Sequence, residues 1–299
     1  MKHKKPYIYY LASIEKRSQK TIDSYVKDIE TFEKWAKKFL KKGLENVTTD
    51  DVDTYTGYCT VDLNNTSSTI NKKLAGVMKY YEYCVKKHGW EVNPVVNATR
   101  QKIKRKEPKF LSESEVDKLL KTILKDKRRG VKAEAKIRDY AMMKIFIAGG
   151  LRVSELCNLM PEHFDFSKKV LYVIGGKGDK DRTVPLGQST IDAILKYFEI
   201  RDIFSPQVCN IFVTNNGTPF DRVSMNKKLK TYCDLAGLDA KSIHPHTLRH
   251  TCATITYAGS GNIRAVQDLL GHTSTEMVSK YIHMVENQVR DVVMTNKFA

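Results

Sequence analysis

The first hundred residues are constrained most strongly by a helical repeat of apolar side chains. Between residues 18 and 39, apolar residues recur at steps of three and four, which is the period of one face of an α-helix. These residues are Ile22, Tyr25, Val26, Ile29, Phe32, Ala36 and Phe39. A chain with this repeat folds as an amphipathic helix packed against other elements, so the pattern indicates a helical start to the protein.

Two further helices follow in the same region. Thr49-Asp50 is a capping pair for a short helix that runs through Tyr58. Thr66 or Ser67 would cap a longer helix with one apolar face over residues 70–84, and a glycine at position 89 would end it. The three helices together predict a small helical domain over residues 1–100.

The stretch QKIKRKEPKF, residues 101–110, separates this domain from the next. Five of its ten residues are Lys or Arg and it contains Pro108, which is typical of an exposed linker.

Beyond the linker, Ser112 and Glu115 form the S-x-x-E pattern of a helix start. A second helix is expected over residues 132–148. Alternating β-branched residues around a glycine-rich turn then predict a β-hairpin before helices resume near residue 189.

Charge and composition narrow the class of protein. The net charge is +17, with +10 in residues 1–110 and +7 in residues 111–299, so both halves favour a polyanionic partner such as nucleic acid. No apolar run is long enough to span a bilayer, and the basic N-terminus lacks the core of a secretory signal. The six cysteines include no C-x-x-C pair and indicate reduced thiols in a cytosolic protein.

Three histidines and an arginine fall within the stretch HPHTLRHT. His246 and His250 are four residues apart, the spacing of two metal ligands on one helix face. His246 and Arg249 are three residues apart, which also shares a face but suits an anion. Pro245 favours a helix start, where free N–H groups attract anions. The stretch lacks the glutamate of H-E-x-x-H and Arg249 would repel a cation, so a zinc hydrolase is the weaker interpretation.

Three other stretches carry candidate residues. Arg152, in GLRVSEL, is expected in the first turn of a helix, where its donors match two phosphate oxygens. In the turn GGKGDKDR, Lys177 lies between glycines and could deliver a proton to a leaving oxygen, and Lys180 competes for that role. LLGHTSTEMVSKYIHM contains His272 and, nine residues later, Tyr281. The order R…K…H-x-x-R…H…Y is a set suited to phosphodiester chemistry without a metal.

These stretches resemble a known family, the tyrosine site-specific recombinases or lambda-integrase family, and within it the short Xer-type members. GLRVSEL, GGKGDKDRTVPL, HPHTLRHTCAT and LLGHTSTEMVSKYIH match in order and spacing, and the resemblance covers nearly the whole chain. It implies that Tyr281 is the nucleophile, which attacks the scissile phosphate, forms a 3′-phosphotyrosyl link and releases a 5′-hydroxyl. It also implies that Glu155 supports the arginine of GLRVSEL and does not itself react.

The resemblance assigns the cationic residues as well. Arg152 and Arg249 would hold the non-bridging oxygens of the phosphate, and Lys177 would be the general acid for the departing oxygen. His246 would assist proton transfer and His272 would hydrogen-bond the phosphate. The remaining two histidines of HPHTLRHT would then be structural, and no metal or cofactor would be needed.

The architecture and assembly that the resemblance implies are those of a C-shaped clamp around duplex DNA. The protein would be mainly α with a small β-sheet: a helical, SAM-like core-binding domain over 1–100, the basic linker 101–110, and an α+β catalytic domain over 111–299. Four protomers would exchange strands between two sites through a Holliday junction in the cytoplasm. The segment after Tyr281, through Ala299, would dock into a neighbouring protomer.

Three questions stay open at the level of sequence. The first is the task, which is either chromosome-dimer resolution or the integration and excision of a mobile element. The sequence also does not show the target DNA site or the need for a partner recombinase or accessory protein. A type IB topoisomerase would use the same chemistry as a monomer that relaxes supercoils. A DNA-binding protein that has lost catalysis is the third possibility, against which the complete set of six candidate residues argues.

Overall fold

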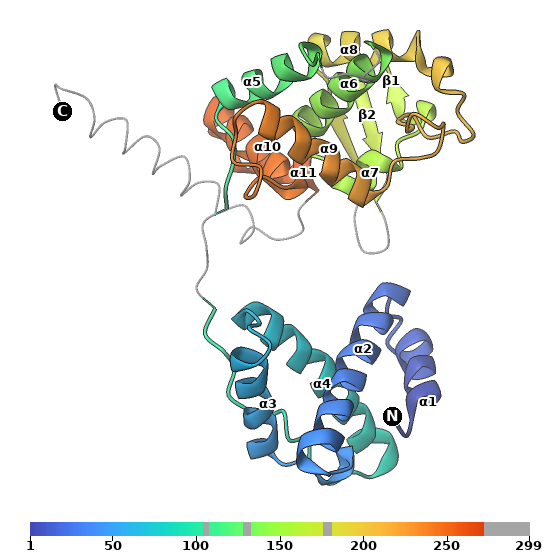
Figure 1. Cartoon of the computed structure of the whole chain (residues 1–299). Coiled ribbons are helices and arrows are strands. Elements are labelled where there is room, and N and C mark those ends of the chain that lie inside the picture. The colour runs from blue at the N-terminus through green and yellow to red at the C-terminus, as the bar shows by residue number, and fades with distance from the viewer. Residues whose placement is uncertain (104–107, 128–132, 176–180, 272–299) are drawn as a thin grey trace, which may run out of the picture. The chain divides into compact units, whose positions relative to one another are not determined.

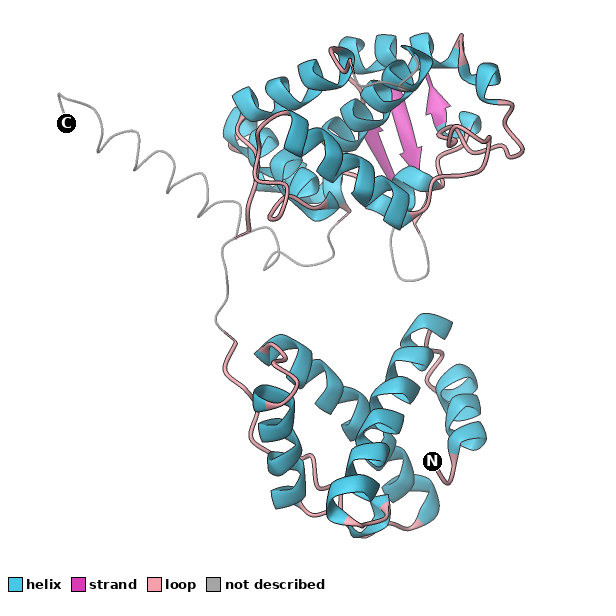
Figure 2. Ribbon diagram, in the orientation of Figure 1, coloured by secondary structure: helices cyan, strands magenta, loops and turns pink. Residues whose placement is uncertain are grey.

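The structure, a computed structural model, describes four stretches of the chain: residues 1–103, 108–127, 133–175 and 181–271. The chain divides into two compact units, Met1–Arg105 and Lys106–Ala299 (Figure 1). Each unit has a hydrophobic core of its own. Figure 2 shows helices in both units and strands in the second. The prediction of a mainly α-helical protein with a small sheet is therefore confirmed.

The described part of the first unit contains four α-helices: α1 Lys4–Tyr9, α2 Gln19–Trp35, α3 Thr49–Val61 and α4 Ser67–His88. Each of the last three begins after a hydroxyl side chain that accepts a backbone N–H bond of the first turn. The cap of α3 is Thr48 and not the predicted pair Thr49-Asp50. The reason is Asp51, whose carboxylate accepts the Thr48 N–H at 2.9 Å and completes a capping box.

The predicted apolar face of α2 forms much of the first core, with one exception at its end. Ile22, Ile29 and Phe32 are buried. Phe39 is 51% exposed, although the repeat places it on the same face. The helix changes to a π-helical segment over Ala36–Leu40, which adds about one residue to each turn and rotates Phe39 outward. Gly89, in the left-handed conformation, ends α4 as predicted.

The second unit packs helices around a three-stranded antiparallel sheet in the order β1-β2-β3. Its described helices are α5 Glu113–Leu124, α6 Ala133–Gly149, α7 Val153–Cys157, α8 Gln188–Phe198, α9 Arg222–Leu235, α10 Pro245–Ser260 and α11 Ile263–Leu270. Its strands are β1 Phe164–Asp165, β2 Val170–Val173 and β3 Arg182–Pro185. The capping box of Ser112 and Glu115 at the start of α5 is confirmed.

The predicted hairpin is formed by β2 and β3. Leu171 lies opposite Val184, and Val173 lies opposite Arg182. These four side chains are buried, whereas Tyr172 between them faces outward, as the two-residue period of a strand requires. Arg182 is thereby carried on the inner face of the sheet, next to the core.

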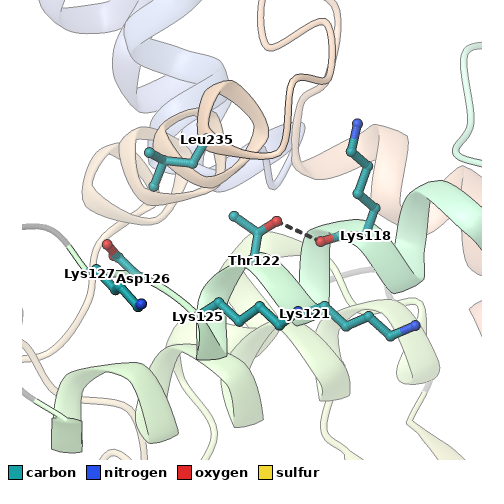
Figure 3. Close-up of a pocket in the computed structure, with 7 residues that line it drawn as sticks. All are labelled: Lys118, Lys121, Thr122, Lys125, Asp126, Lys127 and Leu235. Atoms are coloured by element: carbon teal, nitrogen blue, oxygen red, sulfur yellow. Dashed lines mark hydrogen bonds between the residues drawn. The ribbon is translucent and has the colours of Figure 1, made fainter.

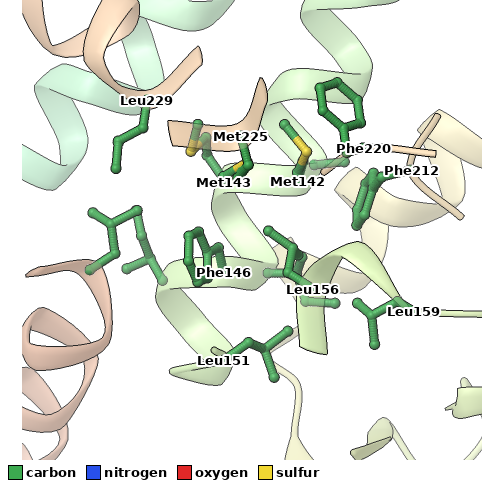
Figure 4. Packing of buried hydrophobic residues seen from close by; sticks show 14 of the residues in the cluster. Met142, Met143, Phe146, Leu151, Leu156, Leu159, Phe212, Phe220, Met225 and Leu229 are labelled. Atoms are coloured by element: carbon green, nitrogen blue, oxygen red, sulfur yellow. The ribbon is translucent and has the colours of Figure 1, made fainter. Parts of the chain in front are cut away.

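Helix α6 is the centre of the second core (Figure 4). Ala141 and Ile145 lie on one side of the helix and Met143 and Ile147 on the other, and all four are buried. A helix that is apolar nearly all round has to be covered by neighbours. Helices α5, α8 and α10 pack against it. None of the helices within the described stretches is long and apolar enough to cross a membrane.

One ion pair lies inside this core. Arg138 and Asp139, on α6, are 1% and 0% exposed, and the guanidinium lies 2.9 Å from the carboxylate. The Tyr232 hydroxyl donates to Asp139 at 2.7 Å, and the Lys228 ammonium lies 2.7 Å from the same carboxylate. Arg138 also donates to the carbonyl oxygen of Val213 at 3.1 Å. The pair therefore joins α6 to α9 and to the loop before it.

We expect Asp139→Asn to destabilise the second unit by about 3–5 kcal/mol, because it leaves a buried guanidinium without its counter-charge. Urea denaturation followed by circular dichroism measures the change. Asp165→Asn, which breaks an ion pair with the exposed Lys168, is the control and should cost less than about 1 kcal/mol. Equal losses in the two variants would contradict a special role of the buried pair.

Candidate active site

The structure describes four of the seven predicted site residues: Arg152, Glu155, His246 and Arg249. The other three, Lys177, His272 and Tyr281, lie outside the described residues. The described part of the site therefore consists of two arginines, a histidine and a glutamate. Arg152 and Glu155 come from the start of α7, and His246 and Arg249 come from the first two turns of α10.

Arg152 is held where α6 gives way to α7. It lies one residue before α7, as the N-cap, and not in the first turn as predicted. Its backbone N–H donates to the Glu155 carboxylate at 2.8 Å, and its guanidinium lies 2.8 Å from the same carboxylate. The Arg152 side chain is 26% exposed. One edge of the site is thus a guanidinium fixed at its base and open to solvent.

Glu155 binds a second arginine, which the sequence interpretation missed. Arg182 on β3 donates to both carboxylate oxygens, at 3.0 Å and 2.7 Å. Burial alone would raise the pKa of Glu155, but the hydrogen bonds from Arg182 and Arg152 lower that pKa to about 2. Glu155 is therefore a permanent anion between two cations. The signal for Arg182 was its place in D-K-D-R-T-V-P-L, directly after the candidate lysine turn.

Arg249 is the most buried cation of the site, at 4% exposure. Its guanidinium donates to the carbonyl oxygen of Gly150 at 2.6 Å and to the carbonyl oxygen of Leu270. Arg182 donates to the neighbouring carbonyl oxygen of Leu269 at 2.9 Å. Carbonyls at the C-terminal end of a helix carry partial negative charge. Two arginines therefore fasten the end of α11, directly before the segment that holds His272.

Gly150 is required at the centre of these contacts. Its φ is +53°, and a Cβ added there would lie 2.7 Å from a methyl carbon of Leu270 and 3.0 Å from Cys252 Sγ. Side chains disfavour both the backbone conformation and the contact distance. The close approach lets the Gly150 carbonyl reach Arg249 while the chain turns from α6 toward Arg152. One glycine thus couples the two candidate phosphate ligands.

His246 lies in the field of the arginines. Pro245 begins α10 as predicted, and His246 follows it on the exposed side of the first turn. Partial burial lowers the pKa of His246, and the charges of Arg249, Arg222 and Arg152 lower that pKa further. Its imidazole is thus held in the neutral form near pH 7. Arg222, the first residue of α9, is a cation of the site that the sequence interpretation did not single out.

A hollow of about 400 Å³ opens beside Arg152. Glu155 of α7 and Asn158, directly after α7, line it, and Val173 lines it at the end of β2. His163 also lines it, with its Nδ1 accepting the Met160 N–H at 3.2 Å. The arrangement is a cationic, solvent-accessible surface beside a recess, which suits the binding of an anion.

No group of three or more His, Cys, Asp or Glu in the described stretches is placed to hold a metal ion. His246 and His250 lie on α10, four residues apart, but His250 is half-buried and His246 is exposed. Helix α10 therefore presents Arg249 and His246, and not a pair of histidines, to the candidate site.

Two family models match most of the chain. The profile of the phage integrase family matches residues 109–288, and that of its N-terminal SAM-like domain matches residues 5–88. A tyrosine recombinase of Thermosipho africanus is 32% identical, with 95% of each chain covered. Tyrosine recombinase XerC of Staphylococcus haemolyticus is 31% identical, with 93% of this chain and 90% of the relative covered.

Solved structures give the same result. The crystal structure of XerA recombinase is 26% identical with a TM-score of 0.55, covering 99% of this chain and 98% of that one. XerH recombinase bound to palindromic difH substrate shares the fold, with a TM-score of 0.75 at 22% identity, over 92% of this chain and 79% of that one. The family models, the relatives and the shared fold together define the class of the protein, an enzyme of DNA recombination. The chain belongs to the phage integrase family and is a tyrosine recombinase.

The depressed pKa of Glu155 makes its contribution to stability depend on pH. Its folded pKa of about 2 lies below the ordinary 4.5, so the stabilisation is complete above pH 4.5 and is lost as the pH falls toward 2. We expect the difference in unfolding free energy between wild type and Glu155→Gln to shrink by about 2 kcal/mol between pH 5 and pH 3. Urea denaturation at the two pH values measures it.

The control is Glu162→Gln, which removes an exposed glutamate from the turn after α7. Its difference from wild type should stay nearly constant over the same pH range. A constant difference for Glu155→Gln as well would mean that this carboxylate titrates normally and is not held as an anion by the arginines.

Proposed function

We propose that this chain is a site-specific recombinase that cuts and rejoins duplex DNA through a 3′-phosphotyrosyl intermediate. One observation carries the proposal: Arg152, Arg249 and a neutral His246 share one cationic site, built on a carboxylate and on helix-end carbonyls. Such a site is preorganised for a phosphate, and the chain's net charge of +17 suits a polyanionic substrate. The family's named relatives, tyrosine recombinases, support the same reading.

The cleavage step exchanges one phosphate ester for another. The Tyr281 oxygen attacks phosphorus, and the bond from phosphorus to the 5′-oxygen breaks. His246 accepts the tyrosyl proton, and Lys177 donates a proton to the departing 5′-oxygen. The tyrosyl ester conserves the phosphoester bond, so rejoining by a 5′-hydroxyl needs no ATP. No cofactor or metal ion enters this scheme.

The cations act by electrostatic stabilisation of the transition state. Arg152 and Arg249 bind the non-bridging oxygens, where charge increases as the tyrosine attacks. His272 adds a hydrogen bond, and Glu155 fixes Arg152 without touching the phosphate. The loss of one preorganised donor of this kind costs about 3–4 kcal/mol in the barrier.

The domains divide the work. Residues 1–100 form the core-binding domain, 101–110 the basic linker and 111–299 the catalytic domain, which together clamp the duplex. Four protomers assemble on two sites and exchange strands through a Holliday junction, and the segment from Tyr281 to Ala299 docks into a neighbour. The XerH structure described as bound to its difH substrate supports duplex DNA as the partner. The work takes place in the cytoplasm.

The biological task is chromosome-dimer resolution or the integration and excision of a mobile element. The name XerC of a relative favours the first. A type IB topoisomerase would share the cleavage chemistry, but it would relax supercoiled DNA without exchanging two sites. A two-site plasmid substrate separates these activities, because only a recombinase yields the exchanged product.

We expect a covalent protein–DNA adduct on nicked suicide duplexes drawn from the source genome, with EDTA present. The adduct should be absent in Tyr281→Phe, because phenylalanine has no attacking oxygen. A denaturing gel measures it. Tyr172→Phe, which alters an exposed tyrosine on β2, is the control and should retain the adduct. An adduct that persists in Tyr281→Phe would contradict the assignment of the nucleophile, and its absence in Tyr172→Phe would indicate a general loss of structure.

A substrate with a modified leaving group can show whether Lys177 or Lys180 is the general acid. We expect Lys177→Ala to slow single-turnover cleavage by roughly 10²–10⁴-fold, as for the loss of a general acid. A substrate with sulfur at the bridging 5′-position should restore the rate, because a thiolate leaves without a proton. Lys180→Ala should cleave both substrates at the wild-type rate. If sulfur restores Lys180→Ala instead, Lys180 is the acid.

A further inference from the structure

A stripe of lysines runs along one face of α5 (Figure 3). Lys118, Lys121 and Lys125 follow each other at spacings of three and four, so they lie on one side of the helix. The opposite side, with Leu119 and Ile123, is buried in the core. The stripe is therefore a solvent-facing surface and takes no part in packing.

These lysines border a hollow between the ends of two helices. The hollow has a volume of about 590 Å³ and is lined by Lys118, Lys121, Thr122, Lys125, Asp126, Lys127 and Leu235. Leu235 is the last residue of α9, which packs against α5. A Cβ added to Gly237, just past α9, would lie 3.6 Å from Lys118 Nζ. The ammonium group of Lys118 therefore reaches across from α5 to the end of α9.

Within the described residues, few acidic groups lie near the lysines of the hollow. Across the described stretches, no carboxylate lies within 4.0 Å of the ammonium groups of Lys118, Lys125 and Lys127. Lys121 has one acidic neighbour, Asp117, at 3.9 Å. Like charges three and four residues apart destabilise a helix by a few tenths of a kcal/mol per pair.

The helix dipole explains only part of this arrangement. It favours cations in the last turn of α5, which accounts for Lys121 and Lys125. It does not account for Lys118, near the middle of the helix, or for Lys127, beyond its end. Four lysines line one recess, with Asp126 as the acidic residue of its lining. The excess positive charge fits an anionic ligand.

The hollow lies at the far end of the helix that begins at the active site. Arg222 starts α9 and its charge acts on His246, whereas Leu235 ends α9 at the hollow. The 14 residues of α9 span about 20 Å, at about 1.5 Å per residue. Lys227 and Lys230 lie on α9 between the two ends.

We propose that this lysine hollow, defined by Lys118, Lys121, Lys125 and Lys127, binds backbone phosphates of the duplex outside the cleavage site. The inference rests on the proposed function and names a second contact of the same substrate. Lysine is a compact point charge on a flexible stem, without the planar fork that reads a defined oxygen pair. The hollow therefore adds affinity and fixes the position of the duplex but does not read its sequence.

The test is the salt dependence of binding to duplexes of unrelated sequence, for which no target site is needed. The full chain is compared with Lys118→Gln/Lys125→Gln/Lys127→Gln by fluorescence anisotropy. The salt concentration is varied between about 50 and 200 mM, a range over which affinity that depends on phosphate contacts falls steeply. Each lost phosphate contact lowers the slope of log K against log salt by about 0.9, so we expect a decrease of about 2–3. The loss of affinity should be equal for all sequences.

Two variants control for charge and for folding. Lys168→Gln/Lys169→Gln/Lys196→Gln removes the same charge from exposed positions of the same unit and should leave the slope near that of wild type. Lys118→Arg/Lys125→Arg/Lys127→Arg keeps the charge and should retain the wild-type slope. Equal decreases in both glutamine triples would overturn the proposal, because the effect would then be one of net charge.

A further arm distinguishes DNA from an acidic protein segment. If a glutamate-rich peptide binds wild type and not the glutamine triple at positions 118, 125 and 127, while the DNA slope is unchanged, the hollow serves a protein partner and the proposal is wrong. Failure of the proposed function is visible separately, as the absence of a covalent adduct at low salt in wild type. The triple should form that adduct to the wild-type extent when DNA is saturating.

Discussion

The candidate site depends on how two arginines bind the end of α11. Arg182 donates to the carbonyl oxygen of Leu269, and Arg249 donates to the adjacent carbonyl oxygen of Leu270. Arg182 also donates to the Glu155 carboxylate. Each cation is buried and is balanced by a carboxylate or by helix-end carbonyls, which lowers the cost of removing its charge from water. The contacts join β3, α7, α10 and α11 around one point. They fix the position of the C-terminal end of α11.

The same contacts explain why only part of the site could be predicted from short sequence motifs. Arg152 and Glu155 are three residues apart, so their pairing follows from one short motif. Arg182 is separated from Glu155 by 27 residues and from Leu269 by 87, and its inward direction depends on the register of β3. A strand shifted by one residue would turn this arginine to solvent. The motif D-K-D-R-T-V-P-L therefore marks the position of Arg182, but the contact of Arg182 with Glu155 is a property of the sheet.

The fold shows the same division between local and non-local causes. Helix starts at Ser112 and Thr66 were predictable because a cap bonds to residues within its own first turn. The choice of Thr48 over Thr49 was decided by a carboxylate three residues further on, which the sequence contains but which competed with an adjacent threonine. The outward turn of Phe39 follows from a π-helical segment, and a regular 3.6-residue repeat contains no signal for it.

Electrostatics links binding to proton transfer in this site. Partial burial lowers the pKa of His246, and the positive field that would attract a phosphate lowers that pKa further, so the neutral imidazole can accept a proton. A phosphate bound to Arg152 and Arg249 would cancel part of that field and raise the affinity of His246 for a proton. Substrate binding would thus strengthen the base at the moment when the nucleophile must be deprotonated. Arginines suit this arrangement better than lysines, because the guanidinium stays charged in a buried position and supplies its own fixed donors.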